Sequence, residues 1–283
     1  MSPILTDLSP EAVIPAMEAN LCELARMFGQ SPTAVLHETP GLLAHLTGIP
    51  HPVFNGVVRA HLEPEEADAR IEQTVAWFLA RGVPMAWITG PSTRPSNLGE
   101  RLKTHGLIQE DRPGLGAEDL GMAVDLLALN EALPAPSELT IRPVQDEAGC
   151  RLWNDVARVA FEVSPEVADG CTRLYASLLS SPSLRHWVGY LQAEPVATCS
   201  LLLGGGVAGI YTVGTIPEAR RQGIGAAMVL EALQAARAMG YHAGILIAAP
   251  MGVGVYRRIG FTVYCKFGVY YWLGGDGAPA AAA

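Results

Sequence analysis

The sequence predicts an α/β (α+β) protein with two tandem domains, each a mixed central sheet flanked by helices. The chain has 283 residues, which exceeds the usual domain size of about 100–200 residues. Hydrophobic residues make up 49% and charged residues 17% of the chain, a composition that supplies a buried core and excludes disorder. A Pro-rich segment at 133–137 separates two halves in which helix and strand patterns alternate.

The two halves differ in charge. Residues 1–137 have eight Lys and Arg against seventeen Asp and Glu, a net charge of −9, whereas residues 138–283 have eleven of each. A net charge of −9 for the whole chain argues against nucleic acid or an anionic membrane as a partner. The uneven distribution favours two domains with different roles.

Composition also indicates the compartment. The uncharged runs 195–217 and 238–256 are interrupted by glycines or by Pro250, so they indicate buried strands and turns rather than membrane spans. The N-terminus shows no secretory signal pattern. The five cysteines are widely spaced and form no CxxC pair, which argues against a disulfide framework and a metal site. We therefore expect a cytoplasmic protein without a metal.

In the second half, the spacing of apolar residues predicts the element order β-α-α-β-β-β-α-β-α-β-β. The predicted ranges are 139–142, 146–161, 165–179, 186–191, 195–203, 207–216, 223–239, 243–248, 252–258, and a final strand pair within 261–273.

Segment 210–228 contains the strongest functional signal. It predicts a strand, a turn and a helix whose first turn contains Gly223 and Gly225. Free N–H groups at a helix N-terminus bind phosphate, and glycine lets a ligand approach the backbone closely. Arg220 and Arg221 add positive charge. The segment therefore favours an anion cradle of pyrophosphate size, with a simple tight connection as the alternative; the Rossmann and Walker patterns are both absent.

The pattern Arg220-x-x-Gly223-x-Gly225 resembles the hallmark of the GNAT superfamily of acyl-CoA-dependent N-acyltransferases. In that family it follows a strand reading hydrophobic-x-V-x-P, and segment 213–217 matches this lead-in with Thr215 in the usual Val place. A second family signature, a short helix ending Tyr-x-x-x-Gly-Phe, is matched by Tyr256 to Phe261. The predicted element order matches from 139 to 273.

The resemblance implies a role for each part of the segment. Backbone groups of Val213, Gly214 and Thr215 would hold the acetyl carbonyl and pantetheine arm of acetyl-CoA, between two strands that splay apart. The pyrophosphate would lie on backbone N–H groups beside Arg220. The residues that supply these groups are Arg221, Gln222, Gly223, Ile224, Gly225 and Ala226.

Tyr256 would act as general acid and protonate the departing thiolate, a step that a phenol can perform; a plain core tyrosine is the alternative. One position departs from the family. Many members have Asn seven residues before this Tyr, whereas this chain has Ala249, so CoA contacts there are expected to be weaker or made by backbone.

The sequence does not identify a general base. Glu162, in the predicted loop after the first helix, is the candidate, and a solvated loop carboxylate is its alternative. Tyr211 and His186 are weaker candidates. Cys199 lies on an apolar strand and indicates packing. Direct attack by an oriented amine requires no acyl-enzyme.

The first half resembles a second, degenerate GNAT-like domain. Its predicted elements are helix 10–28, strand 53–62, helix 64–81, strand 85–89, short helix 97–105 and further strands to 129. Leu102 takes the place of Tyr256, counting back four residues from Gly106. The helix that would cradle pyrophosphate has no glycine in its first turn. It has instead four carboxylates, which repel phosphate: Glu63, Glu65, Glu66 and Asp68.

The predicted domains are therefore a non-catalytic 1–132, a linker 133–138, a catalytic 139–273 and a Gly/Ala/Pro-rich tail 274–283. The predicted function is acetyl transfer from acetyl-CoA to a primary amine of a small acceptor, expected to be cationic because the first half is acidic. The first half would be structural or form one wall of the acceptor cleft. The alternatives are a non-catalytic acyl-CoA-binding sensor or scaffold, and a peptide or protein N-acetyltransferase. The oligomeric state stays open.

Overall fold

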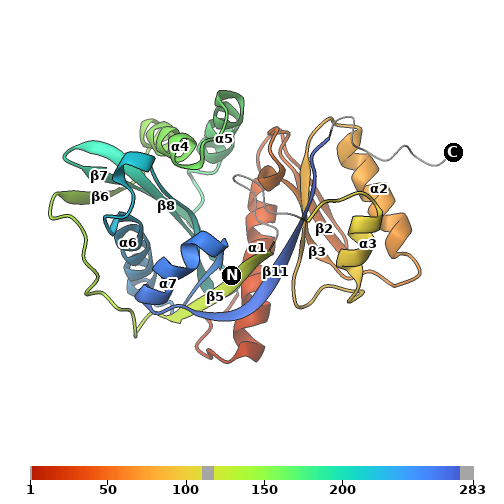
Figure 1. The fold of residues 1–283 in the computed structure, drawn as a ribbon, viewed down its shortest axis with the longest axis horizontal. Coiled ribbons are helices and arrows are strands. Elements are labelled where there is room, and N and C mark those ends of the chain that lie inside the picture. Colours follow the sequence, from red (N-terminus) through yellow and green to blue (C-terminus); the bar gives the residue numbers. More distant parts are fainter. Residues whose placement is uncertain (1, 110–117, 275–283) are drawn as a thin grey trace. The chain divides into compact units, whose positions relative to one another are not determined.

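The computed structural model describes residues 2–109 and 118–274, so the predicted tail beyond residue 274 lies outside the described residues. The chain forms two compact units, each described by itself below (Figure 1). Unit 1 comprises Met1–Glu23 and Leu120–Cys265, and unit 2 comprises Leu24–Asp119 and Lys266–Ala283. Among the described residues, none of the helices combines the length and the hydropathy that a membrane crossing requires.

Unit 1 contains a mixed sheet with the strand order β5-β10-β9-β8-β7-β6. Neighbouring strands are antiparallel except β9 and β10, which are parallel. The strands are β5 (Glu118–Asp125), β6 (Leu139–Pro143), β7 (Leu184–Leu191), β8 (Glu194–Gly204), β9 (Val207–Thr215) and β10 (Ala243–Ala248).

Helices cover both faces of this sheet (Figure 1). They are α4 (Glu147–Phe161), α5 (Pro165–Ser177), α6 (Ile224–Ala238) and α7 (Val253–Ile259). Alternate residues of β8 point to opposite faces. Cys199 packs in the apolar core with α6, whereas Ser200 bonds to His186, whose ring stacks on Trp153 of α4. We call these the α6 face and the α4 face.

Local signals explain where the helices α4 and α5 begin. The Asp146 carboxylate accepts a hydrogen bond from Gly149 N at 2.8 Å and caps α4. Ser164 caps α5 in the same way, and Pro165 follows it at the first helical position. Helix α4 ends at Glu162, which adopts the left-handed conformation with φ 56°.

The first part of α1 (Pro10–Phe28) belongs to unit 1, and Asn20 attaches it to the β8–β9 hairpin. Asn20 is fully buried. Its Nδ2 donates to Gly204 O at 2.8 Å and to Leu202 O at 3.2 Å, while its Oδ1 accepts from the Tyr211 hydroxyl at 2.7 Å. A side chain on Gly209 would meet Asn20 Oδ1 at 2.2 Å, so glycine is required there.

Unit 2 contains a sheet with the order β1-β2-β3-β4-β11, in which only β3 and β4 are parallel. Its core, which includes Trp87 and Phe78, lies under the helices α2 and α3. The elements are β1 (Val35–Glu38), β2 (Leu42–Leu46), β3 (Asn55–Ala60), α2 (Ala67–Leu79), β4 (Met85–Thr89), α3 (Leu98–Thr104) and β11 (Thr262–Trp272). Short 3₁₀ turns occur at Pro52–Phe54 in this unit, and at Pro217–Ala219 and Pro250–Gly252 in unit 1.

The predicted α/β class and the sheets flanked by helices are confirmed. Three details differ. The strands β1 and β2 were not predicted, and the expected final strand pair within 261–273 is one strand, β11. The units also follow different bounds from the predicted domains, because residues 1–23 join unit 1 and residues 266–272 join unit 2. The last five residues of β11 pair with β4. This pairing joins segments far apart in the sequence, so the local residue pattern does not predict it.

Asn20→Ala should destabilise the protein by at least about 2 kcal/mol, because each buried polar group left unpaired costs about 1–3 kcal/mol. The Tyr211 hydroxyl would lose its partner, and two carbonyl groups would lose a donor. Denaturant unfolding measures the effect. Glu11→Gln, an exposed change on the same helix, is the control and should leave stability within about 0.5 kcal/mol. If Asn20→Ala and Glu11→Gln are equally stable, the Asn20 hydrogen bonds do not hold α1 on the β8–β9 hairpin.

Candidate functional site

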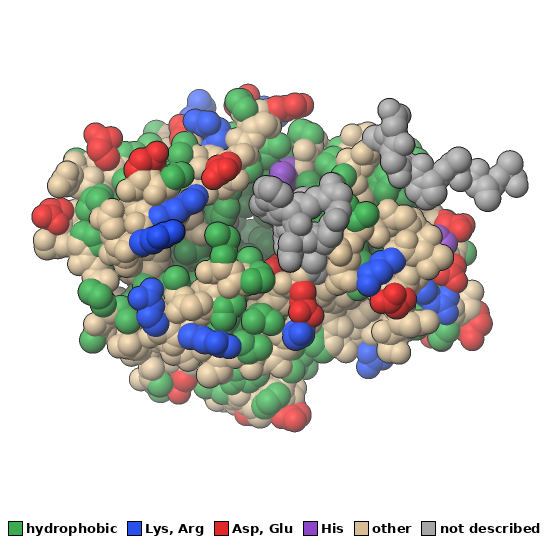
Figure 2. Space-filling view, viewed as in Figure 1, with side chains coloured by type: hydrophobic (Ala, Val, Ile, Leu, Met, Phe, Trp, Pro, Cys, Tyr) green, Lys and Arg blue, Asp and Glu red, His purple; other side chains and the backbone are tan. Residues whose placement is uncertain are grey.

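The parallel ladder between β9 and β10 ends early. Only Ala208 pairs with Gly244 and Gly209 with Ile245, although β9 continues to Thr215 and β10 to Ala248. The two strands therefore part, as the sequence predicted, and backbone groups of β9 beyond Gly209 have no partner in β10. Figure 2 shows basic side chains (blue) among hydrophobic side chains (green) on one face of the molecule.

A β-bulge interrupts the other side of β9. Thr198 of β8 pairs with Gly214 and Ser200 with Tyr211, so two residues, Thr212 and Val213, lie opposite Cys199. Thr212 has φ 49°, a left-handed conformation that a β-branched residue adopts rarely. The Thr198 hydroxyl donates to Thr212 O at 3.0 Å. The predicted carbonyl-binding segment, Val213 to Thr215, thus begins at a bulge.

The two glycines at the start of α6 have different surroundings. Gly223 has φ 85°, and a Cβ on it would lie 2.1 Å from Pro134 O, so the fold itself requires glycine there. A Cβ on Gly225 would meet only Thr215 Oγ1, at 3.8 Å. The packing of the chain therefore leaves Gly225 facing open space at a helix N-terminus.

Backbone N–H groups are available at this end of α6. The first helical bond runs from Ala227 N to Gly223 O at 3.1 Å, which leaves the N–H groups before it without a helical acceptor. The side chains of Ile224 and Ala226 are buried in the core, so these residues can offer a ligand only their backbone. Gln222 is exposed. A pyrophosphate fits this arrangement, because oriented N–H groups and the helix dipole both favour an anion.

The two arginines differ in what they bond. Arg220 Nε donates to Thr215 O at 3.1 Å and its Nη2 donates to Ala160 O at 3.0 Å, so its guanidinium connects the end of β9 to the end of α4. Arg221 is exposed, has φ 63°, and forms no hydrogen bond or ion pair with the described residues. Arg220 thus braces the site, while Arg221 has a free guanidinium.

Tyr256 of α7 faces the α6 side of the sheet, where its ring packs edge-on against Phe261 at a centroid distance of 5.9 Å. Its hydroxyl has no hydrogen-bond partner among the described residues. Burial, with a smaller contribution from Cys199, raises the pKa of Tyr256 to about 12. Tyr256 therefore keeps its proton at neutral pH.

The candidate bases lie in different places. Glu162 is exposed, and its carboxylate lies 4.0 Å from Arg220 Nη2. Tyr211 is bonded to Asn20, and burial raises its pKa well above the usual range. His186 lies between two aromatic rings, and burial lowers its pKa to about 4, so its ring is neutral at pH 7. His186 is buried, and the Tyr211 hydroxyl is already bonded to Asn20.

Two further predicted features can be located. Cys199 is fully buried, and burial raises the pKa of its thiol well above the usual range, which agrees with packing. Ala249 is exposed at the start of a 3₁₀ turn after β10. Its methyl group can form no hydrogen bond, so only the backbone of this residue could bond to a ligand.

Unit 2 lacks the open strand pair. Its parallel ladder between β3 and β4 is followed by a bridge between His61 and Arg94. Arg94 N donates to Ala60 O at 2.9 Å and Leu62 N donates to Arg94 O at 3.1 Å. The loop after β4 thus returns onto β3. No such bridge joins β9 to the segment after β10 among the described residues.

Two other positions distinguish unit 2. Leu102 is fully buried in the apolar core, where the corresponding Tyr256 of unit 1 is only partly buried. At the start of α2, the Asp68 carboxylate accepts from Arg101 at 2.6 Å and lies 3.0 Å from His105 Nε2. The acidic turn therefore bonds to its own unit.

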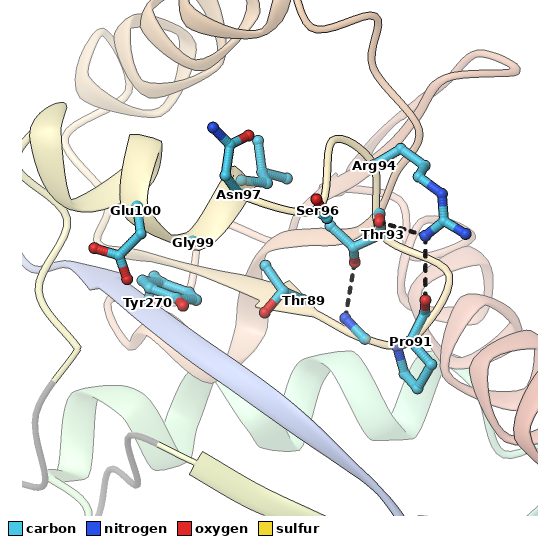
Figure 3. Close-up of a pocket in the computed structure, with 11 residues that line it drawn as sticks. Thr89, Pro91, Thr93, Arg94, Ser96, Asn97, Gly99, Glu100 and Tyr270 are labelled. Carbon is cyan, nitrogen blue, oxygen red and sulfur yellow. Dashed lines mark hydrogen bonds between the residues drawn. The ribbon is translucent and has the colours of Figure 1, made fainter.

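Unit 2 has a polar pocket of about 280 Å³ beyond the end of β4 (Figure 3). Thr89, Tyr270 and Glu100 lie along one side of it. Arg94 Nη1 donates to the loop's own carbonyl groups, Thr93 O at 2.8 Å and Pro91 O at 3.3 Å. Helix α3 beside it has Glu100 in its first turn, which disfavours phosphate. The pocket is not a second pyrophosphate cradle.

Sequence reasoning missed three residues around the unit 1 site: Pro134, Thr198 and Asn20. Pro134 was assigned to a linker, yet its carbonyl packs on Gly223. Thr198 is an ordinary strand residue by pattern, and Asn20 interrupts the apolar stripe of α1. A buried polar residue on an apolar face was the one available signal, and it applied to Asn20.

Comparison with known proteins gives a family match and several similar folds. The acetyltransferase (GNAT) family model matches residues 150–261. A GCN5-related N-acetyltransferase from Kribbella flavida is similar in structure, with a TM-score of 0.67 and 21% identity over 91% of this chain and 96% of that chain. A tandem GNAT protein from the clavulanic acid biosynthesis pathway has a TM-score of 0.59 and 15% identity over 97% and 98%.

A GCN5-related N-acetyltransferase from Sphaerobacter thermophilus has a TM-score of 0.60 and 18% identity over 95% of both chains. Among curated proteins, none matches this chain. Residues 150–261 match the acetyltransferase (GNAT) family model, and the fold along the length of the chain is similar to that of tandem GNAT proteins. The resemblance predicted from the two sequence motifs is confirmed.

The contrast between the two glycines gives a prediction about stability alone. Gly223→Ala should destabilise the protein by about 2 kcal/mol or more, because of its positive φ and the Pro134 carbonyl. Gly225→Ala should be neutral or stabilise by up to about 1 kcal/mol, because alanine favours helix. Denaturant unfolding of the two variants tests this. Equal losses would mean that Gly225 is also required by packing.

Proposed function

We propose that unit 1 is an N-acetyltransferase that transfers the acetyl group of acetyl-CoA to a primary amine of a small acceptor in the cytoplasm. The observation that carries the proposal is the parting of β9 and β10 beside a helix N-terminus whose Gly225 faces open space. A glycine that packing does not require, at the end of a helix with free N–H groups, is explained by a bound anion. Family membership of residues 150–261 supports acyl transfer.

In this proposal the pyrophosphate of CoA lies on the N–H groups from Arg221 to Ala226. Arg221, whose guanidinium is free, supplies a charge-assisted contact, while Arg220 holds Thr215 O in place. The pantetheine arm runs between the parted strands and bonds to backbone groups of Gly214 and Thr215. Its thioester then lies near Val213 and Tyr256.

The reaction is a direct displacement. The neutral amine nitrogen attacks the thioester carbonyl carbon, the C–N bond forms, and the carbonyl oxygen becomes an oxyanion. When the carbonyl reforms, the C–S bond breaks, and the thiolate takes the phenolic proton of Tyr256. The nitrogen releases one proton and the phenolate regains one, so the products are an amide and free CoA thiol.

We propose that water, and not a side chain, accepts the proton that the amine nitrogen releases. Glu162, the base that the sequence suggested, is exposed and lies beside Arg220, so its charge is used in bracing that guanidinium. Water can enter the opening between β9 and β10, so no side chain is needed to accept this proton. Unit 2, with its closed strand pair and buried Leu102, takes no part in the chemistry under this proposal. The acidic composition of residues 1–137 favours a cationic acceptor.

The proposal is tested by mixing the protein with acetyl-CoA and a panel of amines, then measuring free thiol and acetylated product. Transfer to at least one amine is expected. Gly225→Asp should abolish CoA binding in calorimetry, because a carboxylate enters the pyrophosphate space, whereas Gly225→Ala should bind at least tenfold more tightly than Gly225→Asp. Binding of CoA without transfer to any amine would favour a non-catalytic sensor. Unchanged binding by a folded Gly225→Asp variant would contradict the cradle.

Tyr256→Phe should lower kcat by about 10²–10⁴-fold, the usual contribution of a positioned proton donor. The Kd of acetyl-CoA should stay within about twofold. Because the pKa of Tyr256 is about 12, the phenol stays protonated from pH 7 to 10, and the ratio of wild-type to variant kcat should be constant over that range. Steady-state kinetics at several pH values tests this. If the ratio of wild-type to variant kcat decreases between pH 7 and pH 10, a different group is the acid.

A further inference from the structure

The peptide between Thr212 and Val213 has an orientation that its neighbours fix. In a trans peptide the C=O of one residue and the N–H of the next point in opposite directions. Thr212 O accepts a hydrogen bond from the Thr198 hydroxyl at 3.0 Å. Thr198 belongs to β8, so this carbonyl is turned toward β8. The N–H of Val213 is therefore turned the other way, toward the side where β9 and β10 part.

Two further contacts enclose the bulge on the α4 face. The Thr212 side chain lies close to the Tyr175 phenol. A Cβ on Gly214 would lie 2.9 Å from Ala160 Cβ and 3.1 Å from Thr198 Oγ1, so the end of α4 packs directly on the backbone there. A side chain at residue 214 would therefore not fit on this side. The opposite side is the one where β9 and β10 part.

We propose that Thr198 is a positioning residue for acyl transfer, which holds the Thr212–Val213 peptide so that the Val213 N–H donates to the thioester oxygen. This inference rests on the proposed function. An N–H fixed before the reaction stabilises the developing oxyanion without reorganising. The left-handed φ of Thr212 is otherwise unfavourable, and the hydrogen bond from the Thr198 hydroxyl to Thr212 O offsets it.

The variants Thr198→Val and Thr198→Ser separate the hydroxyl from packing. Valine has the same shape without a donor, and serine keeps the donor. Thr198→Val should lower kcat by about tenfold or more, up to the 10²–10³-fold that loss of an oxyanion donor costs. The Kd of acetyl-CoA should stay within about twofold, and Thr198→Ser should restore at least half of the wild-type kcat.

Ser200→Ala is the matched control. Ser200 lies on the same face of the same strand and loses a comparable buried hydrogen bond, the 2.8 Å contact with His186 Nδ1. Its kcat should stay within about twofold of wild type. A full-rate Thr198→Val variant would overturn the proposal. Equal losses in Thr198→Val and Ser200→Ala, or no rescue by serine, would show a packing effect and would also overturn it.

Two readouts do not require turnover. Isotope-edited infrared spectra of bound [1-¹³C]acetyl-CoA should show a carbonyl stretch at lower frequency in the wild type than in Thr198→Val. Amide hydrogen exchange in segment 211–214 of the free protein should be faster in Thr198→Val than in the wild type and in Ser200→Ala. If amide exchange is the same in Thr198→Val and in the wild type, Thr198 does not fix the Thr212–Val213 peptide and the proposal is overturned. If the wild type binds acetyl-CoA with the shifted stretch but acetylates no amine, the proposed function fails while the positioning by Thr198 stands.

Discussion

The site depends on one constraint: β9 cannot form a complete ladder with both of its neighbours. On the β10 side its ladder ends after Gly209, and on the β8 side the bulge at Thr212 shifts the register. A regular strand would pair nearly all of its backbone groups and leave none for a ligand. The two interruptions leave backbone groups of β9 unpaired on the side of β10, while β8 and the end of α4 contact the backbone around the bulge.

The two units show how few changes remove such a site from the same arrangement of elements. In unit 2, the loop after β4 returns to β3 through the backbone of Arg94, which replaces the opening by two hydrogen bonds. Carboxylates at the start of α2 stabilise the N-terminus of that helix. At the start of α6 in unit 1, a bound anion could do the same. Leu102 extends the apolar core at the position of a phenol. Each change replaces a group that the proposed function assigns to ligand binding by an internal contact.

The sequence predicted helices and strands well wherever the local pattern was strong. Helix 10–28 and strands 85–89 and 243–248 were predicted with their observed bounds, because a long amphipathic stripe or a short apolar run between glycines is a local property. It failed where distant segments decide. Strand β1 is exposed at a sheet edge, and the pairing of β11 with β4 joins residues about 180 positions apart.

The candidate site divides in the same way. The glycines, the arginines and Tyr256 were predicted as site residues from their spacing along the chain, and their roles stay predictions. Thr198 and the bulge at Thr212 could not be found, because a left-handed threonine has no sequence signal and its partner lies on another strand. The sequence also could not show that packing requires glycine at 223 and not at 225, because only the fold brings Pro134 against Gly223.

The discontinuous composition of unit 2 affects the order in which the protein can be completed during synthesis. Residues 24–119 leave the ribosome long before residues 268–272, which form the partner strand of β4. During that interval the edge of β4, a strand with the buried residues Met85 and Trp87, has unpaired N–H and C=O groups. A second nascent chain could pair with the same edge. The final strand of the fold is therefore also the element that protects the first half of the chain from association with other copies.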